Sequence, residues 1–334
     1  MSSKRALIEE IFKDLDQKFI DAYAVGPLMY SPATNDKIYD KLAAGEFGTC
    51  FSLALCLEDS IDDDAVEQGE KTIVETFRKI YSNQDKIPYL PKIFIRVRYP
   101  EQISRLYKDL GETADLLQGY TLPKFVVENA KTYIDEIKKV NETSSHAVYM
   151  MPILESGELV SLNTRHQALN TLHDMLMECK EYVLNIRVGG NDLCHIFGTR
   201  RNANETIYDI HPIANILSDI VTYFFEDFVI SGPVWEYFAD ENDNWKTGLE
   251  NEIRMDMLNG FVGKTIIHPN QIEVVANSMK ANQHDLADAI NILTFKADLV
   301  QVSKSASGTR MNEMKTHTNW ARKQIILAKT YGVR

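Results

Sequence analysis

The sequence predicts an α/β fold, a (β/α)8 TIM barrel with an N-terminal helix and a C-terminal helical arm. Eight apolar segments have the length of β-strands, and six of the seven gaps between them carry a helical pattern. The segments recur roughly every 25 to 45 residues, which is typical of strand–helix units around a parallel sheet. Eight such units favour a closed barrel over an open doubly wound sheet. No GxGxxG motif follows the first strand, so a dinucleotide-binding fold lacks its sequence signature.

The composition is that of an ordinary globular protein. The chain has 334 residues, of which 44% are hydrophobic and 25% charged, which is sufficient for a large core. Its net charge of −12 argues against a nucleic acid or an anionic membrane as the main partner. The four cysteines form no CxxC pair and no metal-binding spacing, which predicts a reduced, cytoplasmic compartment. The N-terminus lacks the apolar core of a signal peptide, and no apolar run reaches transmembrane length.

The first elements follow from the spacing of apolar side chains. Residues 5–24 place them at helical intervals, which predicts an amphipathic N-terminal helix. Residues 26–32, GPLMYSP, are interpreted as the first strand and its loop. Residues 50–57, CFSLALCL, are apolar on both faces, as strands of parallel sheets are, and residues 64–81 have a helical pattern.

The later elements continue the alternation. Strands are predicted at 92–97, 119–125, 147–154, 184–190, 227–231 and 260–267. Helices are predicted up to about residue 140, and at 160–180, 213–225 and 249–258. The resulting domains are a barrel at 1–270, including the N-terminal helix, and a helical arm at 271–334. The polar break at 303–309, SKSASGT, fits a hinge, a swapped arm or a plain surface loop.

The segment 184–193, LNIRVGGNDL, is the most informative one. It begins apolar, breaks at Gly189 and Gly190, and ends near the acid Asp192. An apolar run closed by glycines and an acid predicts a core strand that delivers a carboxylate to the rim of the barrel. A helix N-cap is the alternative that this segment leaves open, because Asp is a good capping residue.

Further polar side chains fall at the predicted carboxyl ends of strands, where barrels of this type carry their chemistry. The set is Glu58, Asp59, Arg96, Lys124, Glu155, Asp192 and His268. Charges at a rim are costly to bury without partners, and a shared cation would offset the excess of carboxylates. Two acids from adjacent strands are typical of Mg²⁺ rather than zinc, since the sequence offers no thiolate or histidine cluster. Taken singly, each residue could instead cap a helix, form a structural ion pair or face solvent.

Six segments carry a resemblance to a known family. They are LCLEDSI at 55–61, IFIRVR at 93–98, LPKF at 122–125, ILES at 153–156, VGGNDL at 188–193 and GFVGKTIIHPNQI at 260–272. In this order they resemble the motifs of the citrate lyase beta-subunit-like branch of the HpcH/HpaI aldolase superfamily. GTRR at 198–201 and GPVWEY at 232–237 are most similar to its subgroup of C–C bond-lyase-like proteins.

The resemblance implies roles for the residues at the rim. Glu155 and Asp192 match the family's Mg²⁺ ligands, and Arg96 matches the arginine that grips the carboxylate or carbonyl oxygens of the substrate. Glu58 and Asp59 match acids that hold metal-bound water, and with Arg96 they are the expected catalytic residues. The other residues expected to bind the substrate are Lys124, Gly189, Gly190 and Asn191.

The implied reaction is an aldol or Claisen-type cleavage or condensation, in which Mg²⁺ polarises a 2-oxo acid and stabilises an enolate. The substrate would be a small 2-oxo or hydroxy acid, free or as its CoA thioester. The protein would be a homo-oligomer, a trimer or a hexamer. The alternatives are a non-catalytic subunit that binds metal and metabolite in a larger assembly, or phosphoryl or enolpyruvyl chemistry on a related barrel.

Two regions depart from the family pattern. Residues 308–317 align poorly with the arm that supplies an acid to the neighbouring subunit in related lyases, and Glu313 is the candidate substitute. The aldolase branch uses a histidine after its first strands, whereas no histidine precedes His146 in this sequence. Arg200 and Arg201 suggest a further anionic group on the substrate, with a solvated loop or an interface pair as the alternative.

Overall fold

The structure, a computed structural model, describes residues 17–242, 244–295 and 301–334. The chain divides into two compact units, Val25–Val275 and a second unit that combines Met1–Ala24 with Ala276–Arg334. The predicted division after residue 270, which counts the N-terminal helix with the barrel, stays a prediction.

The unit Val25–Val275 is built on eight parallel strands. They are β1 Pro27–Pro32, β2 Ser52–Cys56, β3 Lys92–Arg96, β4 Leu117–Leu122, β5 Tyr149–Leu154, β6 Ile186–Val188, β7 Ile230–Ser231 and β8 Lys264–Ile266. Their order in the sheet is β7-β6-β5-β4-β3-β2-β1-β8. A parallel bridge from Gly232, directly after β7, to Lys264 in β8 brings the two ends of the sheet together. The predicted (β/α)8 barrel is confirmed.

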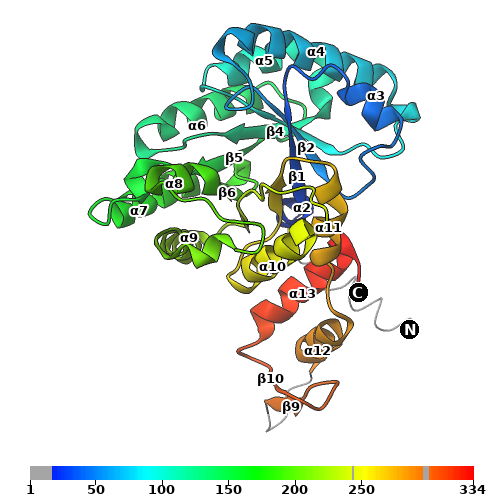
Figure 1. Ribbon diagram of the computed structural model, residues 1–334, viewed down its shortest axis with the longest axis vertical. Helices are drawn as coiled ribbons and strands as arrows, with labels where there is room; N and C mark the ends of the chain where they lie inside the picture. The colour runs from blue at the N-terminus through cyan, green and yellow to red at the C-terminus, as the bar shows by residue number, and fades with distance from the viewer. Residues whose placement is uncertain (1–16, 243, 296–300) are drawn as a thin grey trace. The chain divides into compact units, whose positions relative to one another are not determined.

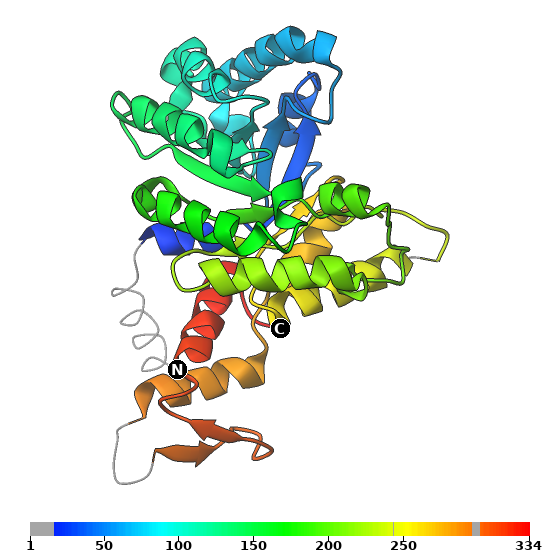
Figure 2. The same cartoon turned by 90° about the vertical axis from the view of Figure 1, so that its left-hand side faces the viewer.

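Helices follow the strands and lie on the outside of the sheet (Figure 1 and Figure 2). They are α3 Ile38–Ala43, α4 Val66–Ser82, α5 Gln102–Leu110, α6 Val127–Asn141, α7 Arg165–Met177, α8 Gly190–Phe197, α9 His211–Phe224, α10 Asn244–Leu258 and α11 Asn270–Ser278. Single 3-10 turns are η1 Asp63–Ala65, η2 Gln84–Lys86, η4 Gly157–Leu159, η5 Lys180–Tyr182 and η6 Ile207–Asp209, and η3 Gly111–Leu116 is longer.

The strands are buried on both faces. Helices cover the outer face of the sheet, and the side chains of the strands fill the interior of the barrel. All five residues of β2 are buried, as its apolar run predicts. Residues paired across parallel strands project to the same face, so register separates interior from exterior. Tyr30 pairs with Ala54, and Leu28 with Thr265, which places all four on one face of the sheet.

The opposite face of β8 carries a buried ionic cluster that ties the strand to α10. Nζ of Lys264 lies 2.8 Å from Oε1 of Glu252 and 2.7 Å from Oδ2 of Asp256. Nε of Arg201 lies 3.0 Å from Oε2 of Glu252, and the hydroxyl of Tyr208 donates to Oδ1 of Asp256 at 2.8 Å. The two acids and two bases leave the cluster neutral, although burial raises the pKa of Asp256 to about 6.

The second unit consists of helices and one hairpin. Its elements are α2 Gln17–Ala24, α12 Gln283–Thr294, α13 Thr318–Tyr331 and the antiparallel pair β9 Val302–Lys304 and β10 Met311–Glu313. The hydroxyl of Tyr331 donates to the carbonyl of Tyr23, which links α13 to α2. The predicted N-terminal helix is confirmed over α2, whereas residues 5–16 lie outside the described residues. The polar break at 303–309 forms part of the hairpin and its turn.

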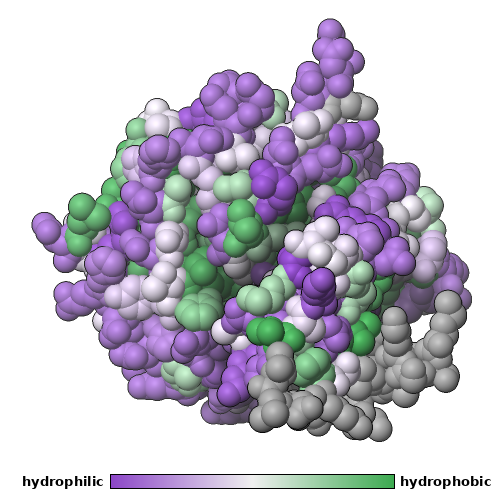
Figure 3. Space-filling model, turned by 90° about the horizontal axis from the view of Figure 1, so that it is seen from below, coloured by the Kyte–Doolittle hydropathy of each residue, from purple (hydrophilic) through white to green (hydrophobic). Residues whose placement is uncertain are grey.

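The surface carries no sign of a membrane span. Within the described part of the chain, no helix is long and apolar enough to cross a membrane. On the face drawn in Figure 3, most side chains are hydrophilic, and hydrophobic ones are interspersed among them. This distribution is ordinary for a protein surface, where apolar side chains occur singly or in small groups.

Candidate active site at the carboxyl ends of the strands

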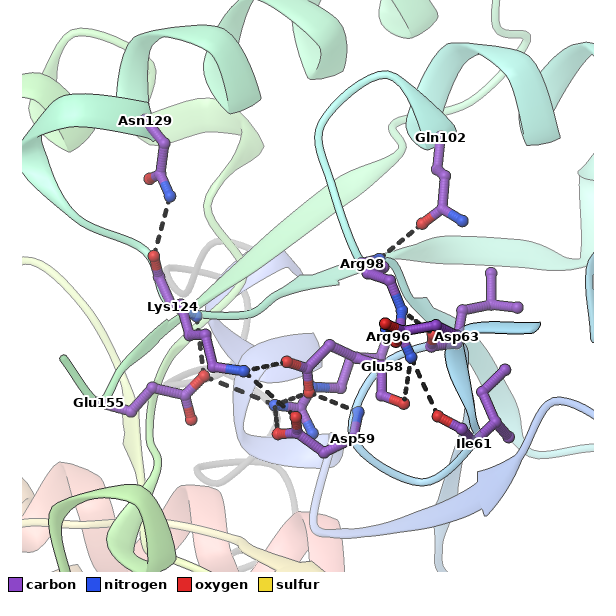
Figure 4. A network of polar contacts seen from close by, with 11 residues as sticks. Glu58, Asp59, Ile61, Asp63, Arg96, Arg98, Gln102, Lys124, Asn129 and Glu155 are labelled. Atoms are coloured by element: carbon purple, nitrogen blue, oxygen red, sulfur yellow. Dashed lines mark hydrogen bonds and ion pairs between the residues drawn. The ribbon is translucent and has the colours of Figure 1, made fainter. Parts of the chain in front are cut away.

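The loop after β2 brings two acids to the carboxyl end of the barrel. Glu58 and Asp59 follow β2 closely, and the backbone N–H of Asp59 donates to Oε2 of Glu58 at 2.7 Å. Arg98, after β3, clamps this loop (Figure 4). Its guanidinium donates to three carbonyl oxygens, those of Leu57 at 2.9 Å, Glu58 at 3.1 Å and Ile61 at 3.0 Å. The clamp fixes the backbone that carries both acids.

Arg96, the last residue of β3, lies at the centre of the acids. Its Nη2 lies 2.9 Å from Oε2 of Glu58, 3.6 Å from Oδ2 of Asp59 and 3.5 Å from Oε1 of Glu155. The residue is buried, and the carboxylates replace the water that its guanidinium loses. Its other neighbour is Tyr30, whose ring centroid lies 5.5 Å from Cζ of Arg96.

Lys124 connects the loop after β4 to the same acids. Its Nζ forms ion pairs with Glu58 and, at 3.2 Å, with Oδ1 of Asp59. Its backbone N–H donates to Oε1 of Glu155 at 2.8 Å. Lys124 has a φ of +48°, a left-handed conformation that is uncommon for a residue with a side chain. Asn129 stabilises this turn by donating to the carbonyl of Lys124 at 2.9 Å (Figure 4).

Glu155 follows β5 and is packed against the start of the next strand–helix unit. A Cβ at Gly189 would lie 1.9 Å from its Oε2, so any side chain at position 189 would displace this carboxylate. Asp192 lies in the first turn of α8, where negative charge is favourable. The N-cap of α8 is Gly189, so the alternative interpretation of Asp192 as the N-cap is wrong.

The electrostatics of the rim favour a bound cation near Glu155. Burial raises the pKa of Glu155 to about 8; Arg96 opposes the rise and the nearby carboxylate of Asp192 adds to it. Burial also raises the pKa of Glu58, against the attraction of Arg96 and Lys124. A cation between Glu155 and Asp192 would stabilise the ionised form of both carboxyl groups.

The other predicted residues are less closely involved. Gly190 is buried, and a Cβ there would lie 2.7 Å from Cβ of Pro233, whereas Asn191 is exposed. His268 stacks on Phe238 with centroids 4.4 Å apart, and its Nδ1 accepts the N–H of Asn270.

The suggestion that Arg200 and Arg201 bind an anionic group is wrong for Arg201. Its guanidinium is buried against Glu252 in the ionic cluster, because the carboxylate there replaces water. Arg200 is exposed and pairs with Glu236 at 3.2 Å. Glu313 is part of β10, where Oε2 accepts a hydrogen bond from Thr316, and its role as an acid stays a prediction.

Three polar residues of this region escape the sequence analysis. Arg98 is the loop clamp, and Tyr30 and Arg187 lie inside the barrel beneath Arg96. The available signal was a charged residue within an apolar strand, since Arg187 interrupts the run LNIRV. Such a residue is costly to bury and therefore indicates an unusual environment.

The donor set at Glu155 and Asp192 fits a magnesium ion. Across residues 17–242, 244–295 and 301–334, no group of three or more His, Cys, Asp or Glu side chains could hold a metal. Mg²⁺ needs fewer protein ligands, since it retains several waters and binds through one or two carboxylates together with substrate oxygens. Burial is the main cause of the raised pKa of Glu155, and the carboxylate of Asp192 adds to it, against the effect of Arg96.

The fold and the charged rim define the class of protein, a TIM barrel with polar side chains gathered at the carboxyl ends of its strands. The family described as "C-C_Bond_Lyase of the TIM-Barrel fold" matches residues 19–333, nearly the whole chain. The protein therefore belongs to this family. The resemblance that the sequence motifs carry is confirmed. A search of curated proteins finds no significant match.

Solved structures share the fold. Protein CitE from Mycobacterium tuberculosis, in complex with magnesium, acetoacetate and coenzyme A, is 18% identical with a TM-score of 0.60, covering 92% of this chain and 99% of its own. A citrate lyase from Burkholderia xenovorans LB400 is 13% identical with a TM-score of 0.69 and covers 93% of each chain. RipC from Yersinia pestis is 17% identical with a TM-score of 0.52, covering 77% of this chain and 96% of its own.

Proposed function

We propose that this lyase is Mg²⁺-dependent and acts on a small 2-oxo or hydroxy acid, free or as its CoA thioester. The observation that carries the proposal is the convergence of Arg96, Lys124 and three acids at the carboxyl end of the barrel. In this class of barrel, catalytic residues come from the ends of several strands. A structural neighbour solved with magnesium, acetoacetate and coenzyme A is consistent with this class of ligand.

Each part of the rim has a proposed task. Glu155 and Asp192 would hold the metal, which would polarise a 2-oxo group and stabilise an enolate. Arg96 would bind the substrate carboxylate through its planar guanidinium group. This interaction would replace its 3.5 Å contact with Glu155. Glu58 and Asp59 would hold water and move a proton beside Arg96. Lys124 would add positive charge, and the amides of Gly189, Gly190 and Asn191 would lie close to the substrate.

The test is a calorimetric titration of oxaloacetate, pyruvate and glyoxylate into the protein, first with Mg²⁺ and then with EDTA. Binding of any one of them that EDTA abolishes supports the proposal. Binding with no turnover would favour a subunit that binds metal and metabolite without catalysis. Binding that is unaffected by EDTA would contradict the metal-dependent site. The proposed cytoplasmic location and trimeric or hexameric assembly are tested separately, by fractionation and by light scattering.

The Arg96→Lys variant should bind these acids about 10 to 100 times more weakly, although it keeps the positive charge. The reason is geometric, because an ammonium group cannot form the two parallel bonds of the guanidinium fork. Calorimetry with Mg²⁺ measures the change. Arg105→Lys, at an exposed ion pair with Glu70, is the matched control and should bind as the wild type does. If the two variants bind the acids with equal affinity, Arg96 does not bind the substrate carboxylate.

The affinity for Mg²⁺ should rise with pH and level off above pH 8. The pKa of Glu155 is raised to about 8, so below this pH the metal must displace a proton from the carboxyl group. One displaced proton changes the apparent affinity by roughly tenfold for each pH unit below the pKa. Titrations between pH 6 and pH 9 measure this slope, and buffers with different ionisation enthalpies measure the released proton. An affinity for Mg²⁺ that does not change from pH 6 to pH 8 would contradict the displacement of a proton from Glu155.

A further inference from the structure

Arg187 places a guanidinium group inside the barrel, beneath the charged rim. It is the middle residue of β6, paired with Ile153 of β5 and Ser231 of β7. Its Nη2 donates to Oγ1 of Thr265 in β8 at 2.7 Å. Thr265 shares a face of the sheet with Leu28, and Arg187 is 1% exposed. Arg187 therefore extends through the interior of the barrel from β6 towards β8.

This cation is only partly satisfied. Nε and Nη1, which carry three of the five N–H donors of an arginine, have no hydrogen-bond partner. Among the described residues, no carboxylate forms an ion pair with Arg187, whereas Glu58 and Glu155 lie against Arg96. Burial lowers the pKa of Arg187, which reflects the cost of the charge there. A buried charge without a partner is expensive, and a bound anion would offset that expense.

Tyr30 connects Arg187 to the rim. It belongs to β1 and shares the interior face, and Cζ of Arg96 lies 5.5 Å from its ring centroid. Arg187 and Arg96 both act on its phenol, where they oppose the rise in pKa that burial causes. Tyr30 is partly exposed, whereas Arg187 is buried. Tyr30 therefore connects the guanidinium group at the rim with the one inside the barrel.

We propose that Arg187, with the hydroxyl groups of Tyr30 and Thr265, binds a second anionic group of the substrate inside the barrel. This inference rests on the proposed function and extends it, because it makes Arg187 a specificity-determining residue for acids with two carboxylates. Arg96 would hold the carboxylate next to the metal, and Arg187 would hold the distal one. A guanidinium with free N–H donors and two neighbouring hydroxyls is a suitable set for a carboxylate.

The first test compares pyruvate, with one carboxylate, and oxaloacetate, with two, by calorimetry in the presence of Mg²⁺. The wild type should bind oxaloacetate more tightly by about tenfold or more. Arg187→Met should remove this preference and change the affinity for pyruvate by less than about twofold. Arg187→Lys should keep part of the preference. An equal loss for both acids, or a preserved preference in Arg187→Met, would overturn the proposal.

A second test separates this inference from the proposed function. It measures thermal unfolding of the metal-free protein with and without succinate, a dicarboxylate that undergoes no reaction here. Succinate should raise the midpoint of the wild type but not of Arg187→Met, whereas Arg254→Met, at an exposed position on α10, should respond as the wild type does. Without ligand, Arg187→Met should unfold at the same or a higher temperature, because it removes an unpaired buried charge.

The outcomes of the two tests are distinguishable. If the wild type binds no oxo acid with Mg²⁺ but succinate stabilises it only through Arg187, the proposed function fails and the anion site stands. If Arg187→Met unfolds at a clearly lower temperature without ligand, or responds to succinate as the wild type does, Arg187 has a structural role and the anion site is overturned.

Discussion

The Asp192→Asn variant is expected to lose Mg²⁺ binding, with an affinity at least about 100 times weaker than that of the wild type, while it keeps its fold. In the proposed site the metal has two carboxylate ligands from the protein, Glu155 and Asp192, so the substitution removes the charge of one of the two. The fold should persist because Asp192 is half-buried in the first turn of α8 and makes no capping hydrogen bond there. Calorimetry measures the affinity, and thermal unfolding measures the fold.

The matched control is Asp135→Asn, at an exposed carboxylate on α6 that pairs with Lys131. It has the same change in net charge but should leave Mg²⁺ binding unaltered. The removal of Asp192 should also lower the pKa of Glu155, because one cause of its raised value disappears. An affinity in Asp192→Asn equal to that of the control would exclude Asp192 as a ligand and leave Glu155 without its proposed partner.

The barrel was predictable because each strand carries a strong local signal. β2 is buried on both faces, and apart from Ser52 its sequence is apolar, as is typical of a strand covered on both sides. The boundaries were less predictable at the shortest strands. β7 contains only Ile230 and Ser231, although the predicted strand starts at residue 227, since strand length depends on pairing with β6 rather than on local sequence.

The hairpin of β9 and β10 was not predictable from the composition of its segment. Residues 303–309 are polar and small, which suggested a loop or a hinge. Their Gly308 adopts a φ of +72°, and Ser305 and Asp288 bind the backbone around the turn. A turn that depends on side chains from another helix leaves no periodic pattern in its own segment.

The rim was predictable because barrels of this type place polar groups where strands end. Arg96 and Glu155 were found by this rule, and the structure brings them within 3.5 Å. Arg98 was missed because its task depends on the path of the loop after β2, which sequence does not specify. Arg187 was missed because sequence alone does not tell whether a charged strand residue faces the interior or a helix; here pairing with Ile153 and the bond to Thr265 place it inside.

The same ambiguity concerns Lys264, which lies two strands further round the barrel, in β8. It lies in β8 next to Thr265, but it projects to the opposite face, between the strand and α10. The two basic residues Arg187 and Lys264 thus have opposite surroundings. Lys264 is fully compensated by Glu252 and Asp256, whereas Arg187 has no such partner. This contrast supports a structural role for Lys264 and a ligand-binding role for Arg187.

Glu252→Gln is expected to destabilise the barrel by about 3 to 5 kcal/mol, because it leaves buried positive charge uncompensated. Glu252 pairs with Lys264 and Arg201 and accepts the backbone N–H of Ile207 at 2.8 Å. In the variant, Lys264 keeps its ion pair with Asp256, whereas Arg201 loses its ion-pair partner. Denaturant unfolding followed by fluorescence measures the loss, and Glu250→Gln, at an exposed position on the same helix, should change stability by less than about 0.5 kcal/mol.

A second substitution tests the cause. If uncompensated charge is responsible, Lys264→Met should recover part of the stability when it is added to Glu252→Gln, although Lys264→Met alone is destabilising. The reason is that the cluster of the double variant again contains one base, Arg201, and one acid, Asp256, and is neutral. If the double variant is instead as unstable as the sum of the two single ones, the loss comes from packing or from the bond to Ile207. A loss in Glu252→Gln no larger than in Glu250→Gln would contradict the importance of the cluster altogether.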